Sequence, residues 1–438
     1  MVPVLFDPVV LGFGWARPSS APFCHPPRPC SVSVRVRPLN KQEQNEGFTW
    51  RIENNSMFQI DAATREPDRA RDAKYALDHV FGPGTTTSDI YAATTQHLIT
   101  KLVSGFNSTV FAYGQTSSGK TYTMRGGARE PGIIPLAVRE VFALIEHTTD
   151  REFLLRVSYM ELYNEEVNDL LAPENMRLPI HESKEAGVYV AGLREDIVTS
   201  PEQARGVLQL LEDGEANRHV GSTRMNEGSS RSHTVFRMVI ESRSRGVGDL
   251  DALPPDDAAG AILVSTLTLV DLAGSERVAK TGAEGIRMKE GTAINKSLLT
   301  LGTVINKLSE GAQLSGAHIP YRDSKLTRIL QPSLGGNAKT AIICNVTPAG
   351  CHTEESHSTL RFACRAKRVV NNAVVNEVVS DAAVLKRQAK EIEELKQRLA
   401  DSGLSGCAAR GGGARAVACA GVRARVSVRS EERPLLRS

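Results

Sequence analysis

The run of residues with the clearest chemical meaning is Gly114–Thr121, which follows the apolar segment Thr109–Tyr113. Two glycines at this spacing let backbone N–H groups converge on phosphate oxygens. The lysine of such a loop reaches the outer phosphates, and the hydroxyl after it can ligate Mg²⁺. The preceding strand makes an ordinary glycine-rich turn a poor alternative. We predict that the whole loop binds nucleotide: Gly114, Gln115, Thr116, Ser117, Ser118, Gly119, Lys120 and Thr121.

A magnesium nucleotide also needs an acidic element, and Leu267–Gly274 could supply it. Here an apolar strand ends at Asp271, a suitable place for a carboxylate that holds Mg²⁺ through a water. Gly274 follows, and its backbone N–H could meet a γ-phosphate. Alone, Asp271 would more often be a cap or turn residue. Beside a phosphate loop, the metal role is favoured.

A third element, Asn226–His233, packs serine hydroxyls beside Arg231 just before a strand. Such a loop suits contact with Mg²⁺, phosphate and water, although a solvated serine-rich loop has the same composition.

These three elements need a scaffold, and the intervening pattern predicts an α/β sheet with helices on both faces. Gly246–Gly260 reads as a polar connection between two strands. Strand patterns occur at Ser31–Pro38, Thr109–Tyr113, Phe153–Leu162, His233–Ser242, Leu263–Leu269 and Ala341–Val346. Helical periodicity occurs at Glu130–His147, Pro201–Leu211, Thr292–Ser309, Asp323–Leu334 and Glu354–Val369.

Composition narrows the class of protein. The chain has 438 residues, of which 41% are hydrophobic and 24% charged, so a mostly disordered chain is excluded. The net charge of +3 and 5% aromatic content speak against nucleic acid as a partner. The seven scattered cysteines favour reduced thiols over disulfides or a zinc site. Because no apolar run approaches the roughly 20 residues that cross a bilayer, we expect a soluble, intracellular protein.

Together, the loop, the serine-rich element and the Asp271–Glu276 run resemble the nucleotide-binding loop and the two switch segments of the kinesin motor domain. The resemblance extends from Ser31 to Asn376. It implies an α/β P-loop motor domain with a mostly parallel, eight-stranded central sheet. It also implies ATP and Mg²⁺ as cofactors, microtubule-stimulated ATP hydrolysis, plus-end-directed movement, and a location on cytoplasmic or spindle microtubules.

The resemblance assigns roles to individual residues of the site. Arg35, Arg37 and Pro38 would contact the adenine base, with Tyr122 against the opposite face. Ser230 would join Thr121 and Asp271 at Mg²⁺, and Ser229 would position the attacking water. The switches would close through an Arg231–Glu276 salt bridge, with Gly274 at the γ-phosphate. Set apart from the resemblance, Glu276 would read as a residue of a solvated turn.

The microtubule contact is expected elsewhere in the chain. His318–Arg328 resembles the loop and helix with which kinesins dock on tubulin, so Tyr321, Arg322, Lys325 and Arg328 are the candidates. The three cations recur at a spacing of three, which places them on one face of a helix. Without the resemblance, a solvated helix face would explain them. Thr292–Ser309 resembles the relay helix, and Lys280–Glu290 its lead-in loop.

Details of sequence favour the centromere-associated class, the seventh of the family, notably Ile286–Gly291 and Val375–Val378. We expect an irregular extension over 1–30, a motor domain over 31–368, a neck linker over 369–380, a short coiled-coil start over 381–402 and a low-complexity tail over 403–438. The coil pattern spans under three heptads, so this chain should be monomeric although longer relatives dimerise.

Two further features bear on function. The linker carries Val369 and Asn376 where kinesins place docking residues, but the residues before Ser31 are rich in proline. Because proline fits few ladder positions, we expect docking to rely on Val369 and Asn376 alone, with a low stall force. The alternatives are a non-motile, ATP-regulated microtubule-binding or depolymerising protein and, less favoured, a P-loop GTPase or helicase.

Overall fold

The computed structural model describes residues 28–60, 74–183, 187–198, 204–218, 231–245, 262–276, 286–313 and 315–378. Several predicted features lie outside these ranges: Ser229 and Ser230, the Gly246–Gly260 connection, the coiled-coil start and the tail.

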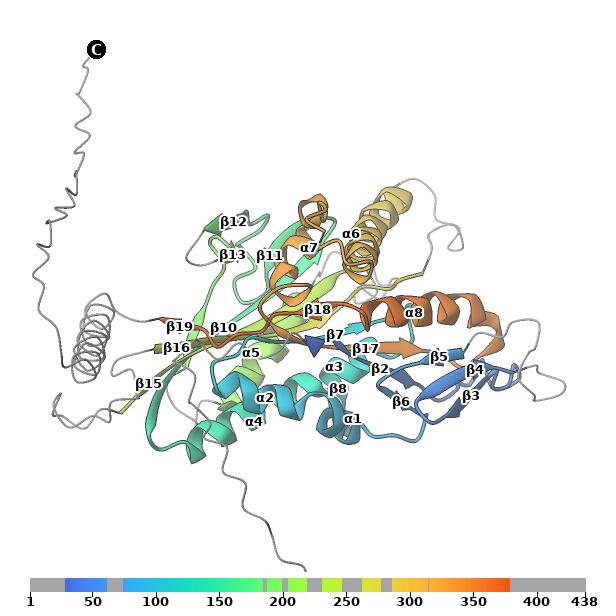
Figure 1. Cartoon of the computed structure of the whole chain (residues 1–438), viewed down its shortest axis with the longest axis horizontal. Coiled ribbons are helices and arrows are strands. Elements are labelled where there is room, and N and C mark those ends of the chain that lie inside the picture. Colours follow the sequence, from blue (N-terminus) through green and yellow to red (C-terminus); the bar gives the residue numbers. More distant parts are fainter. Residues whose placement is uncertain are drawn as a thin grey trace, which may run out of the picture. The chain divides into compact units, whose positions relative to one another are not determined.

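The fold is organised around a ten-stranded sheet, of which eight strands form one continuous path (Figure 1). Strands β16 to β6 of this path run parallel, whereas β15, β10 and β11 join antiparallel. This confirms the predicted α/β class. The path runs through β11 (Glu166–Asp169), β10 (Arg151–Tyr163), β15 (His233–Ser244), β16 (Ile262–Asp271), β7 (Ser108–Tyr113), β17 (Lys339–Val346), β2 (Ser31–Val36) and β6 (His79–Phe81), with β14 (Asp196–Val198) on β10 and β19 (Glu377–Val378) on β16.

Helices cover both faces of the sheet (Figure 1). One face carries α1 (Thr87–Thr94), α2 (Gln96–Val103), α3 (Lys120–Arg125), α4 (Ile133–His147) and α5 (Ala204–Asn217). The other carries α6 (Ile286–Ser309), α7 (Lys325–Ile329) and α8 (Thr353–Ala366).

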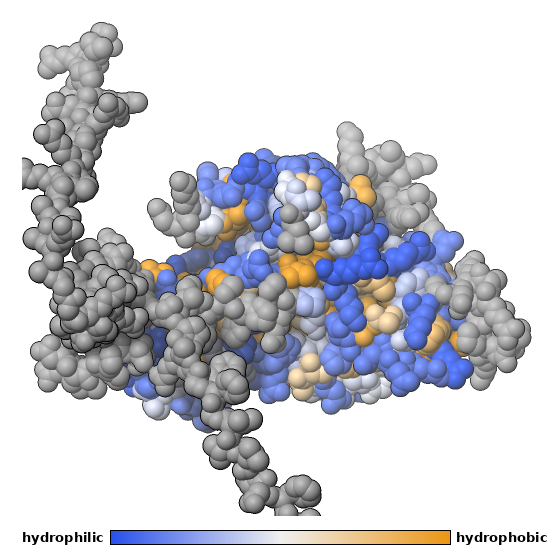
Figure 2. Space-filling model, viewed as in Figure 1, coloured by the Kyte–Doolittle hydropathy of each residue, from blue (hydrophilic) through white to orange (hydrophobic). Residues whose placement is uncertain are grey.

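Strand β7 explains how one sheet serves two cores. Its side chains alternate, so that Val110 and Ala112 join the core under α1–α5 while Phe111 and Tyr113 join the core under α6–α8. The Tyr113 ring stacks on Phe362 of α8 with centroids 3.7 Å apart. Hydrophilic residues dominate the face drawn in Figure 2, consistent with apolar side chains gathered in these cores.

Four small sheets and three 3-10 turns complete the described part. No helix within it is both long and apolar enough to span a membrane. The small sheets are β1 (Arg28–Pro29) with β18 (Val370–Asn371); β3 (Trp50–Glu53), β4 (Ser56–Gln59) and β5 (Lys74–Ala76); β8 (Gly126–Gly127) with β9 (Glu130–Pro131); and β12 (Ile180–Ser183) with β13 (Gly187–Val190). The 3-10 turns are η5 (Tyr321–Asp323), η6 (Gln331–Ser333) and η7 (Gly350–His352).

All five helix predictions need correction at their ends. The helices expected over 201–211 and 354–369 end at Asn217 and Ala366. The helix expected from Glu130 begins at Ile133, because Glu130 and Pro131 pair with β8. The helix expected from Thr292 already begins at Ile286, within the expected lead-in loop. The helix expected over 323–334 is broken, since Ser324 is extended with φ −141° and ψ 145° and separates η5 from α7.

The expectation that the segment before Ser31 leaves the linker unpaired is wrong for its last residues. Arg28 pairs with Asn371 and Pro29 with Val370, and Cys30 N donates to Val369 O at 2.9 Å. Antiparallel ladders alternate between hydrogen-bonded and non-hydrogen-bonded pairs, so the bond at Cys30 places Pro29 in a non-bonded pair. A missing N–H costs nothing there, which explains why proline is tolerated.

Candidate nucleotide-binding site

The predicted motifs meet at the carboxyl ends of four parallel strands. Strand β7 leads directly into the phosphate loop, and β16 beside it ends at Asp271, opposite Ala112. On the other side, β17 and β2 bring Asn345 opposite Arg35. In parallel α/β sheets, ligands bind at this edge because successive strands deliver their following loops there.

The phosphate loop needs its glycines for space and for backbone conformation. Gly114 has a φ of +154°, and a Cβ there would lie 2.2 Å from the carbonyl oxygen of Asn345. Gly119 has a φ of +95°, in the left-handed region. The loop is closed by the Ser118 hydroxyl, which donates to Gln115 O at 2.7 Å. A side chain at Gly114 would therefore displace the loop from its place against β17.

Lys120 is buried beneath this loop, with an exposed fraction of 6%. Its Nζ donates to Gly114 O at 2.8 Å and to Gln115 O at 2.7 Å. Burial lowers the pKa of Lys120 to about 8, against the opposing effect of Asp271 and Glu276. At neutral pH the ammonium therefore keeps its proton and can neutralise phosphate charge.

Thr121 and Asp271 form the part of the site suited to a magnesium ion. The Thr121 hydroxyl donates to Asp271 Oδ2 at 2.6 Å, and Asp271 is 1% exposed. Burial raises the pKa of this carboxyl, an effect opposed chiefly by the charge of Arg218. Its Oδ1 is buried and accepts no hydrogen bond from the described residues. A hydroxyl and a carboxylate oxygen left to accept from a metal-bound water fit Mg²⁺.

The Asp271–Glu276 segment lies directly against the phosphate loop. The Glu276 carboxylate accepts from Thr116 N at 2.8 Å and from the Thr116 hydroxyl at 2.5 Å. A Cβ on Gly274 would lie 2.2 Å from Thr116 Oγ1, so this approach requires glycine. Ser275 N also donates to Gly114 O at 3.1 Å. Arg231 is described and half-buried, and its salt bridge with Glu276 stays a prediction.

At the predicted base-binding end, Arg35 and Tyr122 lie against each other. Arg35 is buried, donates from Nη1 to Thr87 and Thr123 hydroxyls at 3.0 Å, and has Cζ 5.2 Å from the Tyr122 ring centroid. Tyr122 is exposed, and its hydroxyl donates to Glu130 at 2.7 Å. Arg35 and Tyr122 thus contact each other directly, and their place on opposite faces of an adenine base stays a prediction.

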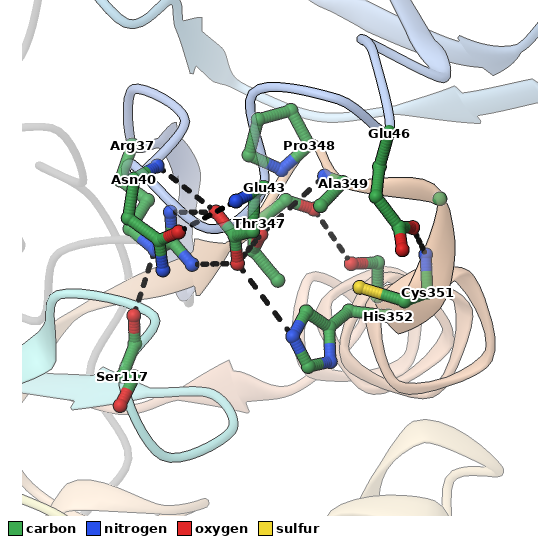
Figure 3. Close-up of polar contacts among 12 residues, drawn as sticks. Arg37, Asn40, Glu43, Glu46, Ser117, Thr347, Pro348, Ala349, Cys351 and His352 are labelled. Atoms are coloured by element: carbon green, nitrogen blue, oxygen red, sulfur yellow. Dashed lines mark hydrogen bonds and ion pairs between the residues drawn. The ribbon is translucent and has the colours of Figure 1, made fainter.

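Arg37, also assigned to the base, directs its guanidinium at protein groups (Figure 3). Nε donates to Ser117 O at 2.7 Å and Nη1 to Pro38 O at 2.8 Å. Nη1 and Nη2 also donate to the two carboxylate oxygens of Glu43, at 2.6 and 2.5 Å. Sequence patterns give no sign of Glu43, which lies in an irregular segment after β2.

Sequence reasoning also missed Arg218 at the end of α5. Its side chain is 3% exposed, and its guanidinium donates to Ser232 Oγ at 3.1 Å and Ser232 O at 3.0 Å and lies 3.9 Å from Asp271 Oδ2. Glu215 pairs with it at 3.1 Å. Arg218 thus connects the end of the serine-rich element with the carboxylate that suits the metal.

His233 is a second missed link, although it closes a motif that was noticed. Its Nδ1 accepts from Ala273 N at 3.0 Å, so Nε2 carries the hydrogen and donates to Ser297 Oγ of α6 at 2.8 Å. Burial, helped by the charges of Arg218 and Lys120, lowers the pKa of His233 to about 3. This neutral imidazole joins the Asp271–Glu276 segment to α6.

The four residues predicted for microtubule contact lie together, but not on one helix. Arg322 belongs to η5, whereas Lys325 and Arg328 belong to α7, so the helical-spacing argument is wrong. Arg322 and Arg328 nevertheless converge on Glu182 of β12, at 2.9 and 3.9 Å. Burial raises the pKa of Tyr321 to about 12, and its hydroxyl donates to Leu334 O at 2.5 Å. Tyr321 thus supports the turn.

The two linker residues lie against the motor core. Val369 is fully buried in the core under α6–α8. Asn376 N donates to Gly105 O at 3.0 Å, its Oδ1 accepts from Asn337 at 2.6 Å, and its carbonyl accepts from Val264 N at 2.9 Å. The segment from β18 to β19 is therefore fixed by several bonds to residues at the amino ends of β7, β16 and β17.

An α/β sheet that ends in a phosphate loop beside an acidic strand end defines a P-loop nucleotide-binding protein. A family model described as "Kinesin motor domain" matches residues 35–369. The chain belongs to the kinesin motor family.

Comparisons with individual proteins support the same family. Kinesin-like protein KIN-7I of Oryza sativa subsp. japonica is 58% identical over 371 residues, covering 85% of this chain and 29% of that protein. Centromere-associated protein E of Homo sapiens is 48% identical over 380 residues, covering 85% and 13%. The structure of a KIF14 dimer with AMP-PNP on a microtubule is 37% identical, with a TM-score of 0.70 and coverage of 80% and 96%. The resemblance to the centromere-associated class is confirmed, and the chain spans less than a third of both curated relatives.

Proposed function

We propose that this chain hydrolyses MgATP and couples the state of the γ-phosphate to its affinity for microtubules. The observation that carries the proposal is the junction of the phosphate loop with the Asp271–Glu276 segment, through Thr121–Asp271 and Thr116–Glu276. Members of the family are ATPases, and the buried Lys120 and Asp271 suit a magnesium triphosphate. Bound Mg²⁺ would neutralise charge on the phosphate oxygens.

The protein's part in hydrolysis is positioning and charge neutralisation, since phosphoryl transfer needs little covalent help. Thr121, Ser230 and Asp271 would hold Mg²⁺, the last through water. Ser229 would orient the attacking water, and Arg231 with Glu276 would close the site. Glu276 must then leave Thr116 for Arg231, which gives the segment two alternative sets of hydrogen bonds.

Microtubule coupling would pass through α6. His233 links the Ala273 backbone to Ser297, so a shift of the Asp271–Glu276 segment reaches α6 through one buried ring. The chain of the KIF14 structure, with the same fold, was solved on a microtubule. We infer that Arg322, Lys325 and Arg328 contact tubulin, with movement directed to the plus end by a linker docked through Val369 and Asn376.

The deciding experiment is a gliding assay with the full chain and polarity-marked microtubules, together with ATPase rates with and without microtubules. Gliding with the minus end leading and a stimulated ATPase are expected. Static binding or shortening of the filaments would instead support the non-motile or depolymerising alternative. Lys120→Ala is the matched inactive control.

A further inference from the structure

Ser117 is the non-glycine residue of the phosphate loop that adopts a left-handed backbone, with φ +60°. L-residues with a Cβ seldom hold this conformation unless the surrounding structure imposes it. The carbonyl oxygen of Ser117 accepts a 2.7 Å hydrogen bond from Nε of Arg37. A charged donor at this distance is a strong restraint on the direction of the Ser117 peptide.

Glu43 fixes the plane of that donor. Its two oxygens accept from Nη1 and Nη2 of Arg37 in a forked pair, and its side chain is nearly buried. Because the guanidinium is planar, a fork on Nη1 and Nη2 also sets the direction of Nε. The hydrogen bonds from Arg37 hold the pKa of the Glu43 carboxyl below its usual value, so Glu43 stays charged at neutral pH.

The turn that carries Glu43 is anchored at its own ends (Figure 3). Asn40 Oδ1 accepts from Glu43 N at 2.9 Å, and Glu43 Oε2 accepts from Asn40 N at 3.1 Å. Farther along, Glu46 Oε2 accepts from Cys351 N at 2.8 Å. Glu43 Oε1 also lies 3.6 Å from Nε2 of His352, the residue before α8. The turn therefore bridges the phosphate loop and the start of α8.

We propose that Arg37 and Glu43 are positioning residues for the triphosphate, acting together through the Ser117 peptide. This inference rests on the proposed nucleotide binding. It differs from the role that the resemblance implies for Arg37, because a residue that contacts the base discriminates between bases, whereas a residue that holds the loop affects all triphosphates equally. Glu43, which holds the guanidinium of Arg37 in its fork, should matter as much as Arg37.

The test compares Glu43→Gln, Arg37→Lys and the double variant in the full chain. Glutamine keeps the shape of Glu43 but removes its charge, and lysine keeps the charge of Arg37 but removes the fork. KM and kcat are measured for ATP and ITP, with thermal unfolding as a check on folding. Glu53→Gln, in the exposed Arg51–Glu53 ion pair, is the matched control.

We expect each single variant to raise KM about tenfold for both nucleotides, as for the loss of one charge-assisted contact, with kcat within about twofold. The KM of the double variant should equal that of either single variant, because both substitutions disrupt the same hydrogen-bonded pair. Glu53→Gln should match the wild type. If Glu43→Gln leaves KM unchanged, or Arg37→Lys changes the ATP-to-ITP ratio, the inference is wrong. If the unaltered chain binds neither nucleotide, the proposed function fails first. Should Glu43→Gln not fold, Arg37→Lys decides.

Discussion

Two charged regions of the molecule differ in how far their side chains are buried. The first, the nucleotide edge, lies at the carboxyl ends of β16, β7, β17 and β2 and includes Lys120 and Asp271. The second, the η5–α7 surface, carries Arg322, Lys325 and Arg328. At the nucleotide edge, Lys120 and Asp271 are almost fully buried, and each has several polar or charged neighbours from different elements. On the η5–α7 surface, the Arg322 side chain is 77% exposed and pairs with Glu182 of strand β12. Removing one member of a buried charged group costs much free energy, because its partners stay buried and unpaired. Breaking an exposed ion pair costs little. Substitutions in the two regions should therefore differ in size and in salt dependence.

The largest expected effect comes from Lys120→Ala, which removes the buried ammonium proposed to meet the phosphates. Nucleotide affinity should fall by a factor on the order of 100 or more, measured with a fluorescent ATP analogue.

Glu276→Ala should leave nucleotide affinity near the wild-type value but reduce turnover by a factor on the order of 100, because only closure of the site is lost. A wild-type microtubule-stimulated rate in Glu276→Ala would contradict the role of Glu276.

A second prediction uses the buried imidazole of His233, whose pKa of about 3 lies far below that of an unfolded chain. Below pH 6.5 the unfolded chain takes up a proton that the folded chain refuses, so stability falls as the pH falls. Between pH 7.5 and 5.5 His233 should cost about 1.4 kcal/mol of unfolding free energy.

Urea unfolding at both pH values measures this cost. His233→Asn keeps an acceptor for Ala273 N and should lose that part of the pH dependence. His318→Asn, at an exposed position, should keep the wild-type profile. Equal profiles for the wild type and His233→Asn would show that the ring is not held neutral by the fold.

Only some features of the two regions could be predicted from the sequence. Strand β7, the phosphate loop and Asp271 follow from local pattern, because period-two burial and glycine spacing are properties of consecutive residues. The contacts that matter at Arg37, Arg218 and His233 are those with Ser117, Asp271 and Ser297, which lie far away in the chain, so no local period encodes them. The break at Ser324 was missed for a related reason, since a spacing of three fits one helix as well as two joined segments.

A third prediction concerns the η5–α7 surface and Glu182. Ala at Arg322, Lys325 and Arg328 should weaken microtubule affinity and flatten its salt dependence, with basal ATPase unchanged, since exposed charges are screened over about 8–10 Å. Glu182→Gln should act in the opposite direction and strengthen binding about twofold, because it frees Arg322 and Arg328 from their pair.

Co-sedimentation with microtubules at several salt concentrations measures both changes. Glu166→Gln, in the exposed Arg177–Glu166 pair, is the matched control and should leave affinity unchanged. A loss of basal ATPase in the alanine variants would mean that this surface supports the fold rather than contacts tubulin. Weaker binding by Glu182→Gln would mean that the ion pairs with Glu182 hold Arg322 and Arg328 in position to contact tubulin, rather than keep them from it.

The smallest expected effect concerns the β1–β18 ladder, where two adjacent residues should respond differently. The bond from Cys30 N to Val369 O makes Arg28–Asn371 the next hydrogen-bonded pair and leaves Pro29 between them with its nitrogen facing away from β18. Arg28→Pro removes a donor from the ladder, so it should lower the stall force in an optical trap and leave unloaded velocity unchanged. Pro29→Val adds a donor that β18 cannot accept, so its stall force should equal that of the wild type. A gain in Pro29→Val would restore the idea that proline limits linker docking here, and an unchanged Arg28→Pro would show that the ladder carries no load.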